Sequence, residues 1–181
     1  MKDFLKLAGT LCIITFLAAA LLCGVNAMTE DQIAANAEKK RNDAMNAILT
    51  SADSFTEVAD GIFEGTADGQ TVGYCVTSVG IGYGGEVSMM VGINTDYSIA
   101  GIEILSHGET AGLGANCTND SFKSQFSGKE YPLVAVKGAA ATNGQISAIT
   151  GATITSRAVV SGVNNAIERL EDTGLMEGGA Q

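Results

Sequence analysis

A cluster of hydroxyl side chains lies just before an amphipathic run near the C-terminus. The segment Thr150–Ser156 reads TGATITS and holds three threonines and one serine around a Gly–Ala pair. Residues without bulk let another group approach the backbone, and the first free N–H groups of a helix stabilise an anion such as phosphate. The hydroxyl of Thr155 is therefore well placed to hold a phosphate group. An ordinary Ser/Thr helix cap is the other interpretation, since such caps are common.

A second polar segment surrounds the only histidine of the chain. His107, Glu109 and Thr110 share one glycine-rich loop. A metal site needs further His, Cys or carboxylate ligands at suitable spacing, and a hydrolase needs a nucleophile paired with this base. The sequence shows neither, so we expect no metal and no catalytic residue here. The loop either faces a ligand or lies on the solvated surface.

The segment Gly80–Gly85 satisfies the GxGxxG pattern of dinucleotide-binding folds. That pattern binds a nucleotide where it opens a helix, whereas Glu86–Ile93 is a strand by residue type. We therefore expect a glycine-rich bend between two strands, where the backbone can approach a ligand, in preference to a nucleotide site.

The four cysteines are not closely spaced pairs of the kind that bind zinc or an iron–sulfur cluster. Cys12 and Cys23 fall in an apolar run. We expect Cys75 and Cys117 to be two buried thiols in preference to a disulfide.

The elements that position these residues follow from periodicity. Apolar residues at helical spacing, followed by Gly174, predict a C-terminal helix that begins at about Ser156. Short β-rich segments bounded by turn residues predict strands, two of them joined as a hairpin by Asn94-Thr95-Asp96. The expected strands are Val72–Val79, Glu86–Ile93, Tyr97–Leu105 and one near Leu133–Val136.

The segments after residue 50 that lie between these predicted elements are expected to be mostly irregular. Ser51–Gln70 contains scattered glycines and acids and predicts turns with at most short extended pieces. Ser106–Asn119 lacks an apolar period and reads as a loop. A short helix is expected around Ser121–Phe126, and a polar loop over Gly138–Gln145.

An apolar run near the N-terminus can cross a membrane. Leu7–Thr29 carries no charge over 23 residues, and at ~1.5 Å per residue it spans a hydrocarbon layer of ~30 Å. Lys2 and Lys6 precede it, so the positive-inside tendency leaves the N-terminus in the cytoplasm and the rest of the chain outside. A cleaved signal peptide ending at Ala27 is the alternative. Lipid attachment at Cys23 is disfavoured because a bulky leucine precedes it.

Composition limits the protein to one modest core. The chain has 181 residues, 46% of them hydrophobic, and a net charge of −10 without a basic run between aromatic residues, so nucleic-acid binding is not expected. Thr29 with Gln32 reads as a capping box that starts a second helix ending near Leu49. We expect an anchor over 1–29, a membrane-proximal helix over 30–50, and one α+β domain over 51–181 with a mostly antiparallel sheet flanked by helices.

Several motifs together resemble a known family. TGATITS resembles the flavinylation motif of the FMN-binding domain family, in which a transferase joins FMN through its phosphate to the last threonine, here Thr155. The agreement extends to GYGG before a strand, HGETAGLG at His107–Gly114, FKSQFSGK at Phe122–Lys129 and AVVSGVNNAI at Ala158–Ile167. With the single anchor and short length, the pattern is similar to the G-subunit family of Rnf electron-transport complexes. Ala111 stands where the family commonly has proline.

The resemblance implies a function and a site. It implies FMN bound covalently in an electron-transfer subunit of a membrane-bound, ion-translocating ferredoxin:NAD oxidoreductase, which acts as an electron carrier without a complete active site of its own. The implied partners are the other membrane and peripheral subunits, a flavin transferase during maturation, and membrane lipid. Because no base is evident in the sequence to activate a threonine hydroxyl, the chemistry of attachment is expected from the transferase. The implied cofactor-binding residues are Thr155, Thr150, Gly151, Ala152, Thr153, Ser156, His107, Glu109, Thr110, Leu113 and Lys137.

Other classes remain open at this point. One is a free-standing extracytoplasmic flavin reductase, and another is a binding or assembly module that keeps the fold without flavin. The homologous component of a sodium-pumping NADH:quinone reductase fits less well, because that chain is typically longer.

Overall fold

The computed structural model describes residues 2–140 and 142–175. The chain divides into two compact units, Met1–Lys40 and Arg41–Gln181. Helix α1 runs from Lys2 to Ile48, and the first unit contains its N-terminal part. Among the described helices, α1 alone is long and apolar enough to cross a membrane. The capping box expected at Thr29 is wrong. That hydroxyl bonds the carbonyls of Val25 and Asn26 inside a continuous helix.

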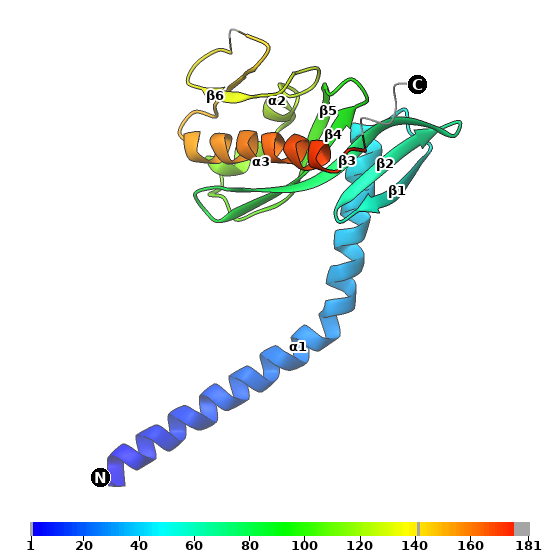
Figure 1. Ribbon diagram of the computed structural model, residues 1–181. Helices are drawn as coiled ribbons and strands as arrows, with labels where there is room; N and C mark the ends of the chain where they lie inside the picture. Colours follow the sequence, from blue (N-terminus) through cyan, green and yellow to red (C-terminus); the bar gives the residue numbers. More distant parts are fainter. Residues whose placement is uncertain (1, 141, 176–181) are drawn as a thin grey trace. The chain divides into compact units, whose positions relative to one another are not determined.

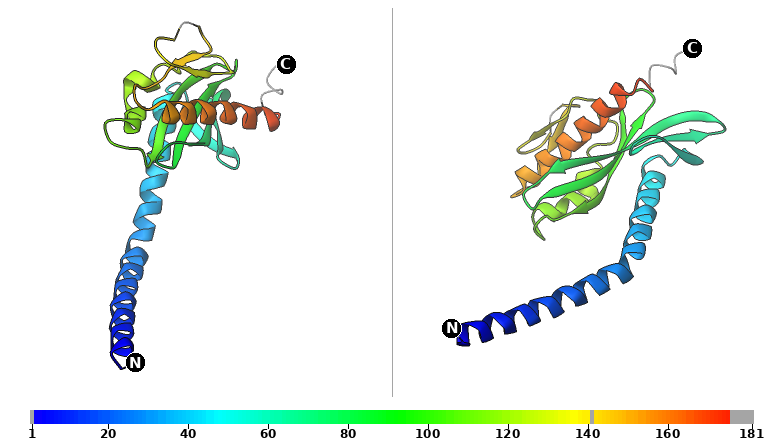
Figure 2. Two further views of the ribbon diagram at one scale, coloured as in Figure 1. Left: turned by 90° about the vertical axis from the view of Figure 1, so that its left-hand side faces the viewer. Right: turned by 60° about the horizontal axis from the view of Figure 1, so that its bottom comes forward.

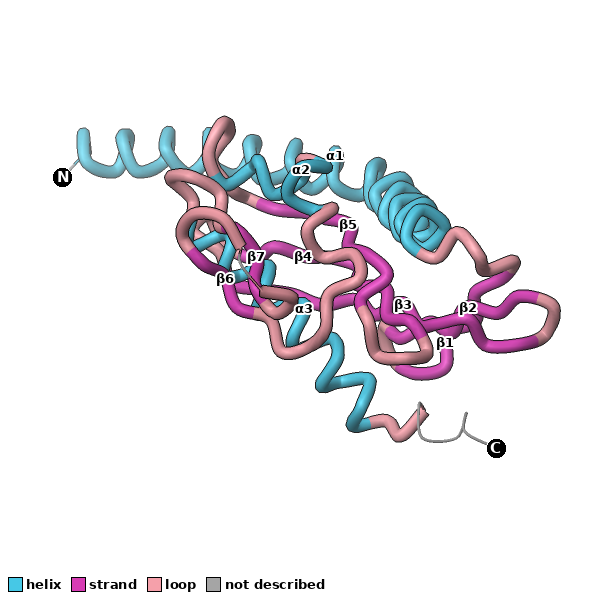
Figure 3. The backbone as a smooth tube through the Cα atoms, turned by 90° about the horizontal axis from the view of Figure 1, so that it is seen from above, coloured by secondary structure: helices cyan, strands magenta, loops and turns pink. Residues whose placement is uncertain are grey.

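The second unit is built on a five-stranded antiparallel sheet in the order β1-β2-β3-β4-β5. The strand order and the helices around it are visible in Figures 1 and 3. Each strand pairs with the next along the chain, so hairpin turns connect them all. The expected α+β class with a mostly antiparallel sheet is confirmed. The strands are β1 Ser54–Ala59, β2 Ile62–Ala67, β3 Gln70–Ile81, β4 Glu86–Asn94 and β5 Ile99–His107.

Side chains alternate between the two faces of this sheet, and each face has its own core. On β4, Val87, Met89, Val91 and Ile93 belong to the larger cluster, which includes the C-terminal helix. Met90 points to the other face, where a smaller cluster contains Ala44, Met45 and Leu49 at the end of α1. The sheet is therefore covered on one face by a complete helix and on the other by the last turns of α1.

Helix α3, Thr153–Asp172, packs along the larger core (Figure 2). Two glycines permit the close approach. A Cβ at Gly80 of β3 would fall far inside contact distance of the Ala158 carbonyl, and a Cβ at Gly162 would lie 2.6 Å from Cε of Met89. The Ser78 hydroxyl donates to the Gly162 carbonyl at 2.7 Å. Helix and sheet are thus fixed by backbone contact as well as by apolar packing.

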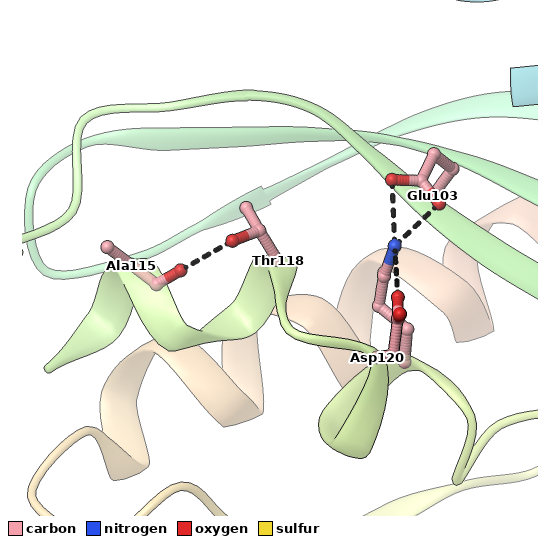
Figure 4. A network of polar contacts seen from close by, with 5 residues as sticks. Glu103, Ala115, Thr118 and Asp120 are labelled. Carbon is pink, nitrogen blue, oxygen red and sulfur yellow. Dashed lines mark hydrogen bonds and ion pairs between the residues drawn. The ribbon is translucent and has the colours of Figure 1, made fainter. Parts of the chain in front are cut away.

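Between β5 and α3 the chain forms short elements, which are η1 Gly114–Thr118, α2 Asp120–Lys123, β6 Val134–Val136 and β7 Gln145–Ser147. Strands β6 and β7 pair in parallel. Lys123 bonds the Glu103 carboxylate of β5 at 2.8 Å and Asp120 at 3.2 Å. Figure 4 shows these two carboxylates beside the Ala115–Thr118 hydrogen bond of η1. An ion pair therefore ties α2 to β5.

Several expectations need correction. Ser51–Gln70 is a β-hairpin, β1 with β2, and is not a series of turns. Strand β5 begins at Ile99 because Tyr97 has a positive φ of 65°, and it continues to His107. Part of the expected loop after Ser106 is the 3-10 helix η1, and the expected loop Gly138–Gln145 ends where β7 begins, at Gln145.

The expected bend at Gly80–Gly85 is confirmed. It joins β3 to β4, closed by a bond from the Gly82 N–H to the Gly85 carbonyl at 2.8 Å. The two cysteines of the domain are confirmed as free, buried thiols. Burial raises the pKa of Cys75 to about 12. Burial also raises the pKa of Cys117, helped by the charge of Glu109.

Candidate functional site

A pocket of about 550 Å³ opens where the loop after β5 meets the start of α3. This volume lies within the range of small-molecule sites, ~300–1,000 Å³. Three separate segments contribute, from the β3–β4 turn, the loop after β5 and the residues around the α3 N-terminus. The lining residues are Tyr83, Glu109, Thr110, Leu113, Gly114, Gly151, Ala152, Thr153, Ile154 and Thr155.

The N-terminus of α3 borders this pocket without a side-chain cap. Ala152 is the N-cap residue, with φ −134°, and its side chain accepts no backbone hydrogen bond. Ser156 makes the first bond of the helix, to the Ala152 carbonyl at 3.0 Å, so the N–H groups of the preceding turn have no intrahelical partner. The helix begins at Thr153 and not at Ser156, which puts Thr155 inside the first turn. This end of the helix can stabilise an anion.

The hydroxyl of Thr155 donates to the Oε2 atom of Glu109 at 2.6 Å. Thr155 is 1% exposed and Glu109 8% exposed, so the pair is shielded from bulk water. The other carboxylate oxygen, Oε1, accepts the N–H of Gly84 at 2.9 Å. Burial acts to raise the pKa of Glu109, but bonds from Thr155 and from backbone N–H groups, with the charge of a neighbouring histidine, hold it below its ordinary value. The carboxylate is therefore ionised at neutral pH.

Glycines leave room for this pair. A Cβ on Gly114 would lie 2.6 Å from the Thr155 hydroxyl oxygen and closer still to Oε2 of Glu109. A Cβ on Gly82 would collide with Oε1 of the same carboxylate, and one on Gly84 with the Gly108 carbonyl. Gly82 and Gly114 are thus explained by the space that one carboxylate and one hydroxyl occupy, and Gly84 by the backbone of the loop after β5.

Four of the eleven residues predicted from sequence do not line the pocket. Ser156 is buried, accepts the N–H of Ile149 at 2.9 Å and donates to Ala152, so it fixes the turn before α3. The Nδ1 atom of His107 accepts the Glu109 N–H at 3.2 Å. Thr150 is exposed and lines a separate polar hollow beside η1, and Lys137 is exposed after β6.

The structure brings the other seven together and adds three that the sequence reasoning did not assign to the site. Tyr83 and Ile154 are large, 75% and 54% exposed, and form an apolar rim with Leu113. Gly114 is the third. The available signals were the tyrosine of the GYGG turn and the isoleucine between the last two threonines of TGATITS.

These features suit a flavin phosphate ester. An uncapped helix end, a positive-φ Gly151 and a small Ala152 surround the Thr155 hydroxyl, and apolar side chains form the rim. The model of the FMN-binding domain family matches residues 82–168, which include both the loop and the motif. The second unit therefore contains an FMN-binding domain. A model of the RnfG N-terminal region matches residues 1–48.

The similar proteins agree over nearly the whole chain. The G-subunit of a proton-translocating ferredoxin:NAD(+) oxidoreductase complex from Clostridium ljungdahlii is 33% identical over 93% of this chain and 92% of its own. The G-subunit of an ion-translocating oxidoreductase complex from Methanosarcina acetivorans is 34% identical over 92% and 94%. The chain belongs to the G-subunit family of ion-translocating oxidoreductase complexes.

Solved structures agree on the fold. The C-subunit of a Na(+)-translocating NADH-quinone reductase from Parabacteroides distasonis has a TM-score of 0.52 and 28% identity over 59% of this chain and 58% of that one. NqrC from Shewanella oneidensis has a TM-score of 0.52 at 20% identity, covering 69% and 74%. The latter similarity shows the fold alone.

Proposed function

We propose that this chain carries FMN on Thr155 through a phosphodiester and serves as an electron-transfer subunit of a membrane-bound, ion-translocating ferredoxin:NAD oxidoreductase. The observation that carries the proposal is the position of Thr155, whose hydroxyl lies beside a ligand-sized pocket in the first turn of an uncapped helix. FMN supplies the ability to accept and donate electrons singly or in pairs.

Different residues around the pocket would hold the phosphodiester and the flavin ring of FMN. Free N–H groups of the first turn of α3 stabilise the negative charge of the phosphodiester, and Gly151 and Ala152 leave its approach open. Thr110, Leu113 and Tyr83 line the rest of the pocket and would face the flavin ring. Both oxygens of Glu109 bond within the protein, so we assign Glu109 to the attachment point and not to the ring. A contact of Lys137 with the ring or the phosphate of FMN stays a prediction.

The apolar part of α1 anchors the chain, and the domain lies outside the cytoplasm. A covalent tether suits that location, because a cofactor lost there would not be replaced. The domain exchanges electrons with neighbouring subunits, and a flavin transferase attaches the FMN. The G-subunit relatives match over nearly their full length, which favours this complex over a quinone reductase.

The test is an intact mass measurement of the full chain produced together with a flavin transferase. We expect wild type to gain one FMN less one water, and peptide mapping to find it on Thr155. Thr155→Ala should fold, insert and carry no covalent flavin, because the attachment hydroxyl is gone. Thr153→Ala is the matched control in the same helical turn and should retain flavin. Flavin mapped to Thr150 or Thr153, or persisting in Thr155→Ala, would overturn the proposal.

A further inference from the structure

We propose that the Glu109 carboxylate is the base that takes the proton of the Thr155 hydroxyl when flavin is attached, so that this chain supplies part of the chemistry of its own modification. The inference rests on the proposed attachment of FMN at Thr155. The sequence offered no evident base. Folding brings this one to the hydroxyl from 46 residues away.

The geometry is that of a nucleophile paired with an oriented base. Oγ1 of Thr155 donates to Oε2 of Glu109 at 2.6 Å, which is within the reach required for proton transfer. The Gly84 N–H holds the other oxygen, Oε1, at 2.9 Å and so fixes the plane of the carboxylate. The Glu109 N–H in turn donates to Nδ1 of His107 at 3.2 Å, which fixes the backbone of the loop. Nucleophile, base and orienting groups are all present.

The step balances with one co-reactant of defined class. The phosphate of free FMN has no good leaving group, so the donor must be a flavin phosphoanhydride such as a flavin dinucleotide, held by the transferase. Oγ1 of Thr155 forms a bond to the flavin-side phosphorus, and the anhydride P–O bond breaks to release the nucleoside monophosphate. The hydroxyl proton moves to Oε2 of Glu109. No electron is gained or lost by any group.

Charge gives a second, independent reason. Glu109 is the only charged side chain among the described residues that line the pocket. Once Thr155 is esterified, its oxygen carries no proton to donate to Glu109. An ionised Glu109 would then lie against an anionic phosphodiester and be repelled by it. If Glu109 keeps the proton, the neutral carboxyl group can donate to that oxygen instead. The esterified Thr155 and the neutral Glu109 can then remain side by side next to Gly114.

The competing interpretation is that Glu109 only holds Thr155 and the loop in place. Glu109→Gln separates the two, because glutamine keeps the size of the side chain and can still bond Gly84 but cannot take up the proton. Glu109→Asp keeps a carboxylate at a shorter reach. Glu103→Gln is the matched control. It removes a carboxylate on β5 that is bonded to Lys123 (Figure 4) and does not line the pocket.

The experiment measures covalent flavin incorporation into each full-length, detergent-solubilised chain by a purified flavin transferase with flavin adenine dinucleotide. We expect Glu109→Gln to lower kcat by ~10²–10⁴-fold, the usual contribution of a general base, with KM for the acceptor chain little changed. Glu109→Asp should recover part of the rate, and Glu103→Gln should match wild type. A positioning role alone would leave the kcat of Glu109→Gln close to wild type, because glutamine can still hydrogen-bond both Gly84 and Thr155.

The outcomes are distinguishable. If the unmutated chain carries flavin on Thr155 and Glu109→Gln is modified with an unchanged kcat, Glu109 is not the base. The proposed function would still stand. No flavin on wild-type Thr155 would overturn the proposed function itself. Melting curves establish that each variant is folded. If Glu109→Gln does not fold, Glu109→Ala decides, and an undiminished kcat there contradicts the proposal.

Discussion

Glu109 is a nearly buried carboxylate whose ionised form is stabilised by hydrogen-bond donors from two other parts of the chain. The Thr155 hydroxyl comes from α3, and the Gly84 N–H comes from the β3–β4 turn. One side chain therefore ties the loop after β5 to both the helix and the sheet. Its protonation state matters for stability as well as for chemistry.

The stability of the unmodified domain should fall in acid because of Glu109. Its pKa in the folded state lies below the ordinary value of about 4.5, so its contribution is complete above that value and is lost as pH falls through the lower, folded-state pKa. We expect urea unfolding of the Thr155-unmodified chain to show a steeper acid loss in wild type than in Glu109→Gln. Glu130→Gln, at an exposed carboxylate, is the control. Equal pH slopes in wild type and Glu109→Gln would contradict the assignment.

The proposed attachment residue, Thr155, could be singled out from sequence, whereas its hydrogen bond to Glu109 could not. Thr155 belongs to a short segment in which every residue contributes to one recognisable pattern. The bond to Glu109 joins positions 46 residues apart, and nothing local to either position encodes it. The same holds for Gly82 and Gly114, whose lack of a side chain is explained only once both are seen to contact the same carboxylate.

At the scale of elements, Gly80 is the residue of β3 that lets α3 approach closely. Gly80→Ala would push a methyl group into the Ala158 carbonyl, which belongs to the helix backbone and cannot rotate away. We expect a loss of at least ~1–3 kcal/mol of unfolding free energy, as for overpacked cores, measured by urea denaturation. Gly101→Ala is the control on β5, where the nearest atom to a new Cβ is Cγ2 of Ile48 at 3.7 Å. Equal stability of the two variants would show that the helix can shift freely.

The elements that sequence reasoning missed are those that depend on their neighbours. Strand β1 is almost wholly exposed, so it has no apolar alternation to detect. Strand β2 contains Gly65, which reads as a turn residue, yet a Cβ there would crowd Leu49 and Phe55 at 3.2 Å. Helix α3 starts early although β-branched residues disfavour helix. The strands β3, β4 and β5 were predictable because their own residues are β-rich and buried.

At the scale of the whole molecule, the chain combines one apolar helical segment with a domain whose thiols are inaccessible. Cys75 and Cys117 are 0% exposed, and Cys12 and Cys23 lie within the apolar run. Thiol reagents react with thiolates in contact with water, so the native cysteines should give little background. The protein is therefore suited to topology mapping by single added cysteines.

We expect an added cysteine on the domain to react from outside the cell and one at the N-terminus to be protected. Asp172→Cys lies at the exposed end of α3, and Phe4→Cys precedes the apolar run. The charge bias of Lys2 and Lys6 predicts that a membrane-impermeant maleimide labels Asp172→Cys in intact cells and labels Phe4→Cys only after permeabilisation. The reverse pattern would show that the domain faces the cytoplasm. Labelled Asp172→Cys in a mature chain that begins at Met28 would show instead that the apolar run is a cleaved signal, because no anchor would then remain.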